Sequence, residues 1–209
     1  EDRYYVMWSD RILDREHYEV NSFGTNGDAT LCIAEIDPQK PWKLISDPVR
    51  ICRPKYGWDR IENEINEGPY LLEHGEDLFV TFSGSSVGVL YCVGLLWAKR
   101  GSDLLDPCSW KELPYPVLTK ESIPGQFGPG HNCFIKDPDR QEDDLVVLHA
   151  KEFDFDDPED EDIMIAKNPR NSIIRRVHWN RFGYPVLDMQ EHQDIPEPLR
   201  KIQGTVELF

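Results

Sequence analysis

The sequence has 209 residues, of which 39% are hydrophobic and 11% aromatic, and its 23 Lys and Arg against 39 Asp and Glu give a formal charge of −16. This length and aromatic content are sufficient for a globular core. So large a negative charge repels phosphate backbones and anionic lipids, so we expect neither nucleic acid nor a membrane surface as a partner. No segment approaches the ~18 consecutive apolar residues that a membrane-spanning helix needs.

The chain begins with a unit of short predicted strands, approximately residues 1–50. Two runs rich in β-branched and aromatic residues lie at Tyr4–Ser9 and Thr30–Ile36, and Gly, Pro and Asp separate such runs throughout the chain. Trp42 follows, and Pro48-Val49 comes after it. Only three residues stand ahead of the first run, so we expect this unit to lack an innermost strand.

The same order of features occurs twice more, in units of approximately 66–118 and 128–190. Each of these units opens with an additional Gly-Pro segment before its two β-rich runs and its Trp. In the second unit the successive segments are Gly68–Leu72, Leu78–Ser83, Leu90–Ala98 and Trp110 with Pro116-Val117. In the third unit they are Gly128–Phe134, Leu145–Ala150, Ser172–His178 and Trp179 with Pro185-Val186.

The Trp and Pro-Val positions keep a constant offset in all three units. Successive Trp residues are 68 and 69 residues apart. Radially repeated units of a few short antiparallel strands are the blades of a β-propeller, so the sequence predicts this all-β fold. The alternative is a β-sandwich whose strands have similar sequence patterns by coincidence. Since propellers close with roughly four to eight blades, we expect residues 1–209 to be part of a larger domain, ending in a tail at 191–209.

The opening segments of the second and third units carry titratable residues. Glu67 precedes Gly68-Pro69, and His131 lies in the string Gln126–Asn132. The first strand of a propeller blade lines the central channel, and Gly and Pro fix the local backbone, so we expect both side chains at the axis. A carboxyl group there among aromatic residues can act as a general acid. The alternatives are a solvated or ion-paired carboxylate for Glu67 and a packing role for His131.

Two further features predict no site. Segment 152–162 has eight acidic residues, but Pro158 and Glu159 stand where an EF-hand loop needs a ligand and a glycine, so we expect a solvated loop. The five cysteines include no C-x-x-C pair, which predicts neither a zinc site nor a disulfide framework.

Several segments together resemble glycoside hydrolase family 43, a family of five-bladed propellers. They are Ile65–Pro69, Tyr91–Leu96, Leu104–Pro107 with Ser109-Trp110, Gln126–Asn132 and Trp179–Pro185. The resemblance implies about three of the five blades and is greatest to exo-acting α-L-arabinofuranosidases, inverting enzymes that act on arabinan or arabinoxylan side chains outside the cell. A β-xylosidase of the same family, and a non-catalytic carbohydrate-binding propeller or truncated pseudoenzyme, are the alternatives.

The resemblance also implies roles for individual residues. Glu67 would be the general acid, and His131 would face a calcium or sodium ion at the axis that the chemistry itself does not require. The residues implied to contact the sugar are Tyr91, Gln126, Phe127, His131 and Asn132. Ile173 occupies a position where the family often has Arg, and Arg170, three residues earlier, is the candidate to substitute for it. The aspartate base and a second aspartate that tunes the acid would precede Glu1, so we expect these 209 residues alone to be inactive.

Overall fold

The computed structural model describes residues 3–11, 29–152 and 170–193. Within these ranges the chain is almost entirely β-strand, with short 3-10 helices at Gly57–Asp59, Pro107–Ser109 and Glu191–Gln193. None of these helices has the length and apolarity that crossing a bilayer requires. The predicted acidic loop beyond Glu152 and the predicted tail from residue 194 onward lie outside the described residues.

Three antiparallel sheets follow one another along the chain. The first contains β1 (Tyr4–Arg11), β2 (Ala29–Asp37), β3 (Lys40–Leu44) and β4 (Val49–Cys52). The second contains β5 (Asn66–His74), β6 (Asp77–Gly84), β7 (Cys92–Lys99) and β8 (Lys111–Glu112). The third contains β9 (Phe127–Lys136), β10 (Asp144–Lys151) and β11 (Asn171–Arg176), followed by the hairpin of β12 (His178–Trp179) and β13 (Pro185–Val186).

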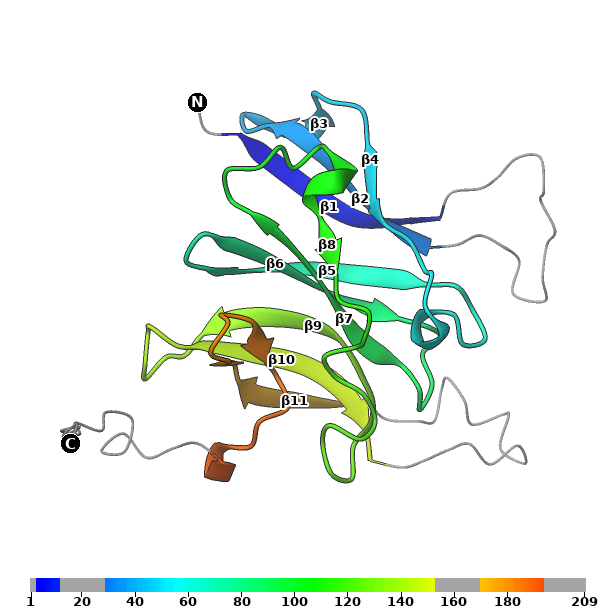
Figure 1. Ribbon diagram of the computed structural model, residues 1–209, viewed down its shortest axis with the longest axis vertical. Helices are drawn as coiled ribbons and strands as arrows, with labels where there is room; N and C mark the ends of the chain where they lie inside the picture. Colours follow the sequence, from blue (N-terminus) through cyan, green and yellow to red (C-terminus); the bar gives the residue numbers. More distant parts are fainter. Residues whose placement is uncertain (1–2, 12–28, 153–169, 194–209) are drawn as a thin grey trace, which may run out of the picture.

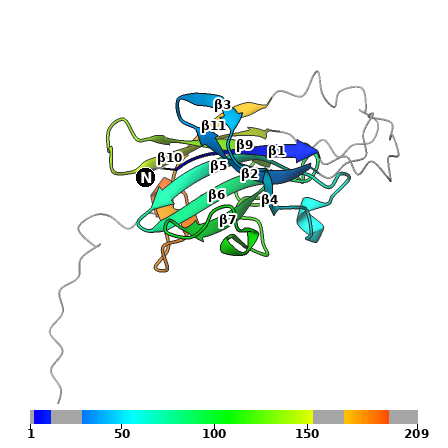
Figure 2. The same cartoon turned by 90° about the horizontal axis from the view of Figure 1, so that it is seen from above.

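The sheets are stacked in sequence order, as blades of a propeller are. Figure 1 shows the β1–β4 sheet, the β5–β8 sheet and the β9–β11 sheet one above the next. Figure 2 shows β5, β6 and β7 running alongside one another across the molecule. The inner strands β5 and β9 are in contact, although they belong to different blades. This stacking is the arrangement that the predicted all-β propeller fold requires.

The Trp and Pro-Val repeat marks the outer part of each blade. Trp42 lies in β3, Trp110 directly precedes β8, and Trp179 lies in β12. The Val of the first Pro-Val pair begins β4, and the Val117 amide donates to the Val93 carbonyl of β7 at 2.7 Å. Among the described strands β1 pairs only with β2, so the first blade has no inner strand there. This agrees with the expectation from the sequence.

The middle sheet is buried on both faces. One apolar cluster lies between it and the first sheet, and a second lies between it and the β9–β11 sheet. Phe79 and Val80 belong to different clusters because successive side chains of a strand point to opposite faces. All of Leu78–Ser83 is buried, which explains why this segment has only apolar residues and small hydroxyl residues.

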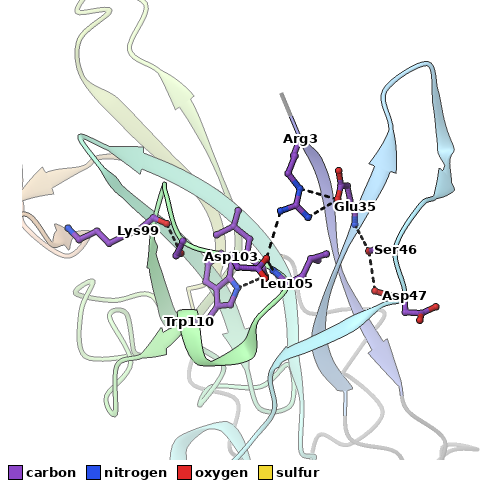
Figure 3. A network of polar contacts seen from close by, with 10 residues as sticks. Arg3, Glu35, Ser46, Asp47, Lys99, Asp103, Leu105 and Trp110 are labelled. Atoms are coloured by element: carbon purple, nitrogen blue, oxygen red, sulfur yellow. Dashed lines mark hydrogen bonds and ion pairs between the residues drawn. The ribbon is translucent and has the colours of Figure 1, made fainter. Parts of the chain in front are cut away.

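A polar network joins the first two blades (Figure 3). Arg3 donates from Nη2 to Glu35 Oε2 of β2 at 2.7 Å, and its Nη1 lies 3.8 Å from Asp103 in the loop after β7. Asp103 also accepts a hydrogen bond from the Leu105 amide, and the Trp110 indole donates to the Leu104 carbonyl. Because the Arg3 and Asp103 side chains are exposed, solvent screens their attraction, so it contributes little to stability.

Candidate active site

Three of the predicted site residues meet where the inner strands begin. Glu67 is the second residue of β5, Tyr91 directly precedes β7, and His131 lies in β9. The Tyr91 hydroxyl donates a hydrogen bond to Glu67 Oε1 at 2.7 Å and lies 3.4 Å from His131 Nδ1. The Glu67 carboxylate and the His131 ring are 4.0 Å apart. The three side chains therefore form one polar cluster contributed by two adjacent blades.

Two glycines beside Pro, Gly68 and Gly130, allow this close approach. Gly68 has a φ of +60°, and a Cβ added there would lie 3.2 Å from His131 Cε1. A Cβ at Gly130 would lie 2.1 Å from Tyr91 Cε1, a distance that no side chain could occupy without moving the ring. His131 itself has a φ of 49°, and its amide donates to Ser83 Oγ at 2.7 Å. The Gly-Pro strings thus leave room for the rings and fix the backbone that carries them.

Burial determines the protonation state of the tyrosine. Tyr91 is fully buried, and this burial together with the neighbouring Glu67 carboxylate raises the pKa of its phenol, so the hydroxyl keeps its proton and donates it in the hydrogen bond. The side chains of Glu67 and His131 are 29% and 57% exposed. The cluster therefore combines a buried tyrosine with a carboxylate that a ligand can reach.

His149 of β10 is a member of this cluster that the sequence analysis did not single out. Its ring lies parallel to Tyr91 with the ring centroids 5.7 Å apart, and it stacks at 6.4 Å on His131. Burial first, and then the positive charges of Arg170, His131 and Lys151, together lower the pKa of His149 to about 4. The ring is therefore neutral near pH 7, and its buried Nδ1 has no hydrogen-bond partner among the described residues.

A sequence signal for His149 did exist. It is the only ionisable residue in the apolar run Leu145–Ala150. Its contact with the site comes from the register of β9 and β10, which sets His149 opposite Gly130. That register includes irregularities on both sides of His149, and an irregular pairing is not encoded in a simple alternation of residues.

The remaining predicted residues have no hydrogen bonds to the cluster within the described residues. Gln126 directly precedes β9, and its buried Oε1 has no hydrogen-bond partner in the described part of the chain, while the half-buried Phe127 begins that strand. Asn132 is buried, and its Nδ2 donates to Thr81 Oγ1 of β6 at 2.9 Å, so it faces the sheet interior. Arg170 is exposed, and its charge acts on both Tyr91 and His149.

His131 is the residue of this cluster that the resemblance places opposite the axial ion. A calcium ion takes six to eight oxygen ligands. Within residues 3–11, 29–152 and 170–193, no group of three or more His, Cys, Asp and Glu side chains is arranged to hold a metal ion. The described residues therefore do not furnish a coordination shell, and the ion at His131 stays a prediction on which no chemical step depends.

Comparison with known protein families decides the assignment. The model of the family described as "Glycosyl hydrolases family 43" matches residues 1–185 of the chain. The chain belongs to glycosyl hydrolase family 43. The predicted resemblance is thereby confirmed, and the three stacked sheets are blades of this family's five-bladed propeller.

Among curated proteins, this family 43 chain is 36% identical over 130 residues to "Extracellular exo-alpha-(1->5)-L-arabinofuranosidase" of Streptomyces chartreusis, a match that covers 62% of the chain and 39% of the relative. It is 31% identical over 201 residues to "Alpha-L-arabinofuranosidase B" of Pyricularia oryzae, covering 90% of the chain and 40% of the relative.

Among solved structures, an alpha-L-arabinofuranosidase from Lactobacillus brevis superimposes with a TM-score of 0.69 at 29% identity. The match covers 87% of the family 43 chain and 51% of that structure. The chain thus spans about half of this structure and about two fifths of the curated relatives named above.

Proposed function

We propose that the protein containing this chain is an exo-acting α-L-arabinofuranosidase that removes arabinofuranosyl units from neutral plant polysaccharide side chains with inversion of configuration. The observation that carries the proposal is the Glu67 carboxylate, which reaches solvent while Tyr91 fixes one of its oxygens at 2.7 Å. The names of the relatives at 31% and 36% identity support the choice of arabinofuranosides.

In this proposal Glu67 protonates the glycosidic oxygen as the leaving group departs. General acid catalysis requires a proton donor held within hydrogen-bond reach of that oxygen. The Tyr91 hydroxyl occupies Oε1, so the proton is carried on Oε2, which points the acid in one direction. Since Tyr91 is buried among packed strands, the carboxyl group is held in place before substrate arrives.

Inversion also requires a base on the opposite side of the sugar. The two carboxyl groups of an inverting glycosidase are about 6.5–9.5 Å apart, with room for the attacking water between them. We assign this role to an aspartate of the longer protein, on a blade that the 209 residues do not include. The activity proposed is accordingly that of the longer protein, and these residues contribute its acid and part of its sugar pocket.

The pocket residues of the proposal are His131 of the cluster and, beyond it, Phe127, Gln126 and Arg170. An aromatic face packs against a sugar ring, and polar groups hydrogen-bond its hydroxyls. A neutral sugar also avoids repulsion by a chain of charge −16. Because relatives from Streptomyces are named extracellular, we propose that the enzyme acts outside the cell.

The test is hydrolysis of a substrate panel by the full-length protein. Aryl α-L-arabinofuranosides and arabino-oligosaccharides are compared with aryl β-D-xylopyranosides, and the anomer released first is identified by proton NMR. We expect arabinose to be released as its β-anomer. Preferred cleavage of the xyloside would replace the proposal with a β-xylosidase, and binding of oligosaccharides without any hydrolysis would replace it with a carbohydrate-binding propeller.

A further inference from the structure

The strand β6 carries two buried hydroxyls on the face that packs against the third blade. Phe79, Thr81 and Ser83 share this face because side chains alternate along a strand, and Phe79 lies in the apolar cluster between the two sheets. Thr81 and Ser83 are both fully buried. A buried hydroxyl is costly unless it is hydrogen-bonded, so the partners of these two residues indicate why an otherwise apolar strand contains them.

Both hydroxyls bind β9 of the third blade. Thr81 Oγ1 accepts from Asn132 Nδ2 at 2.9 Å, and Ser83 Oγ accepts from the His131 amide at 2.7 Å. Ser83 also stands opposite Glu67 in the pairing of β5 with β6, so its side chain lies on the same face of the sheet as the carboxylate. Ser83 is therefore a neighbour of both the predicted acid and the histidine beside it.

The Ser83 hydroxyl also reaches the phenol of Tyr91. A Cβ at Gly130 would lie 2.1 Å from Tyr91 Cε1 and 3.1 Å from Ser83 Oγ, so both side chains approach this glycine. Burial and the Glu67 carboxylate raise the pKa of the Tyr91 phenol, whereas a hydrogen bond with the Ser83 side chain acts in the opposite direction. A hydrogen bond that favours the phenolate is one in which the phenol oxygen accepts, so Ser83 is the donor.

The available donors and acceptors give these hydrogen bonds one direction. An amide can only donate, so Ser83 Oγ accepts from His131 and its own single proton is left for Tyr91. Tyr91 in turn has one proton and two neighbouring groups, Glu67 Oε1 at 2.7 Å and His131 Nδ1 at 3.4 Å, and the shorter contact takes the proton. The chain runs from the His131 amide through Ser83 and Tyr91 to the Glu67 carboxylate.

We propose that Ser83 is a positioning residue for the general acid. By donating to the phenol oxygen, Ser83 turns the Tyr91 proton toward Glu67 Oε1. Tyr91 then stabilises the carboxylate that remains when the other oxygen, Oε2, has given its proton to the glycosidic oxygen. Ser83 is buried, so it acts through Tyr91 and not by touching the sugar. This inference rests on the proposed function, since it takes Glu67 as the acid.

The experiment compares Ser83→Ala with Ser85→Ala in the full-length protein. Ser85 is a similarly buried serine two residues further along the chain, and its hydroxyl donates to the Ile61 carbonyl at 2.6 Å. The kcat and KM of each variant are measured on arabino-oligosaccharides and on a dinitrophenyl arabinofuranoside, whose leaving group needs no acid. Each alanine is also combined with Tyr91→Phe, and urea unfolding verifies that every variant is folded.

We expect Ser83→Ala to lower kcat on arabino-oligosaccharides about threefold to tenfold, the effect of one hydrogen bond, with KM and the activity on the dinitrophenyl substrate nearly unchanged. In the Tyr91→Phe background the same change should lower kcat by less than about twofold, because the hydroxyl through which Ser83 acts is already absent. Ser85→Ala should resemble the parent on both substrates. Equal losses on both substrates, or the full loss again in the Tyr91→Phe background, would overturn the positioning role.

The proposed function and the role of Ser83 can fail separately. Preferred hydrolysis of xylosides, with the effects of Ser83→Ala and Tyr91→Phe still coupled on xylo-oligosaccharides, would reject the arabinofuranosidase alone. Arabinoside hydrolysis that Ser83→Ala leaves unchanged would reject the role of Ser83 alone. Absence of hydrolysis by the parent protein would reject both.

Discussion

Replacing His149 with Gln removes a titratable group of the cluster whose pKa is far below its ordinary value. The imidazole lies parallel to the Tyr91 ring at 5.7 Å and has Arg170, His131 and Lys151 as its charged neighbours. All three neighbours are cations when protonated, so they oppose a positive charge on the ring in addition to the opposition from burial. Glutamine keeps a polar group of similar length but does not titrate.

The magnitude follows from the pKa. Burial, together with the neighbouring positive charges, lowers the pKa of His149 from 6.5 to about 4 in the folded chain. Between pH 6.5 and about pH 4, His149 therefore binds a proton in the unfolded chain but not in the folded chain. The contribution of His149 to the free energy of unfolding is thus full above pH 6.5 and falls as the pH decreases. At 1.36 kcal/mol per pKa unit, the contribution lost is at most about 3 kcal/mol.

The assay is urea unfolding of the full-length protein, followed by tryptophan fluorescence at pH about 7.5 and about 4.5, on either side of most of this titration. Other groups also titrate, so the quantity of interest is the difference between parent and variant. We expect His149→Gln to lose less stability on acidification than the parent, and His192→Gln, at an exposed histidine, to behave like the parent. Equal losses in the parent and His149→Gln would show that His149 is not held neutral by its surroundings.

Three further predictions concern the cluster and the blade contact. Tyr91→Phe removes the donor to Glu67, so kcat/KM on arabino-oligosaccharides should fall about tenfold to a hundredfold while urea unfolding changes little; unchanged kinetics would contradict a positioning role. Gly130→Ala places a Cβ 2.1 Å from the Tyr91 ring and should lower the free energy of unfolding by about 1–3 kcal/mol, whereas Gly101→Ala, with no atom within 4 Å, should change it by less than about 0.5 kcal/mol. Comparable effects at both glycines would refute the steric argument. Arg3→Ala should change the free energy of unfolding only slightly, and less again at high salt, because the Arg3 side chain is exposed and solvent screens its ion pairs; a large, salt-independent loss would be inconsistent with this assignment.

The blades could be predicted because their signals are local. A strand such as β6 is mainly apolar, with Thr81 and Ser83 as the polar residues of its Leu78–Ser83 run, since both of its faces are buried, and the constant offset from Trp to Pro-Val marks where each blade ends. Glu67 and His131 stand beside Gly-Pro at the start of inner strands, so the topology of a propeller brings them together.

The rest depends on packing between segments far apart in the chain. Trp42 and Trp110 hold equivalent positions in the repeat, yet Trp42 is 81% exposed and Trp110 only 7%, because only the second is covered by a neighbouring blade. His149 reaches Tyr91 through an irregular strand register. Glu112 and Cys52 are 60 residues apart and meet at the contact between two sheets. None of these pairings follows from composition or spacing.

The most direct test of the account is the dependence of Glu67→Gln on the leaving group. A general acid is needed when the departing oxygen is a poor leaving group and is dispensable when that oxygen belongs to an activated phenol. The full-length variant should therefore lose cleavage of arabino-oligosaccharides while retaining much of its activity on a dinitrophenyl arabinofuranoside, and Glu73→Gln, at an exposed carboxylate of the same strand, should resemble the parent on both. Full activity of Glu67→Gln on the natural linkage, or equal losses on both substrates, would contradict the assignment of Glu67 as the acid.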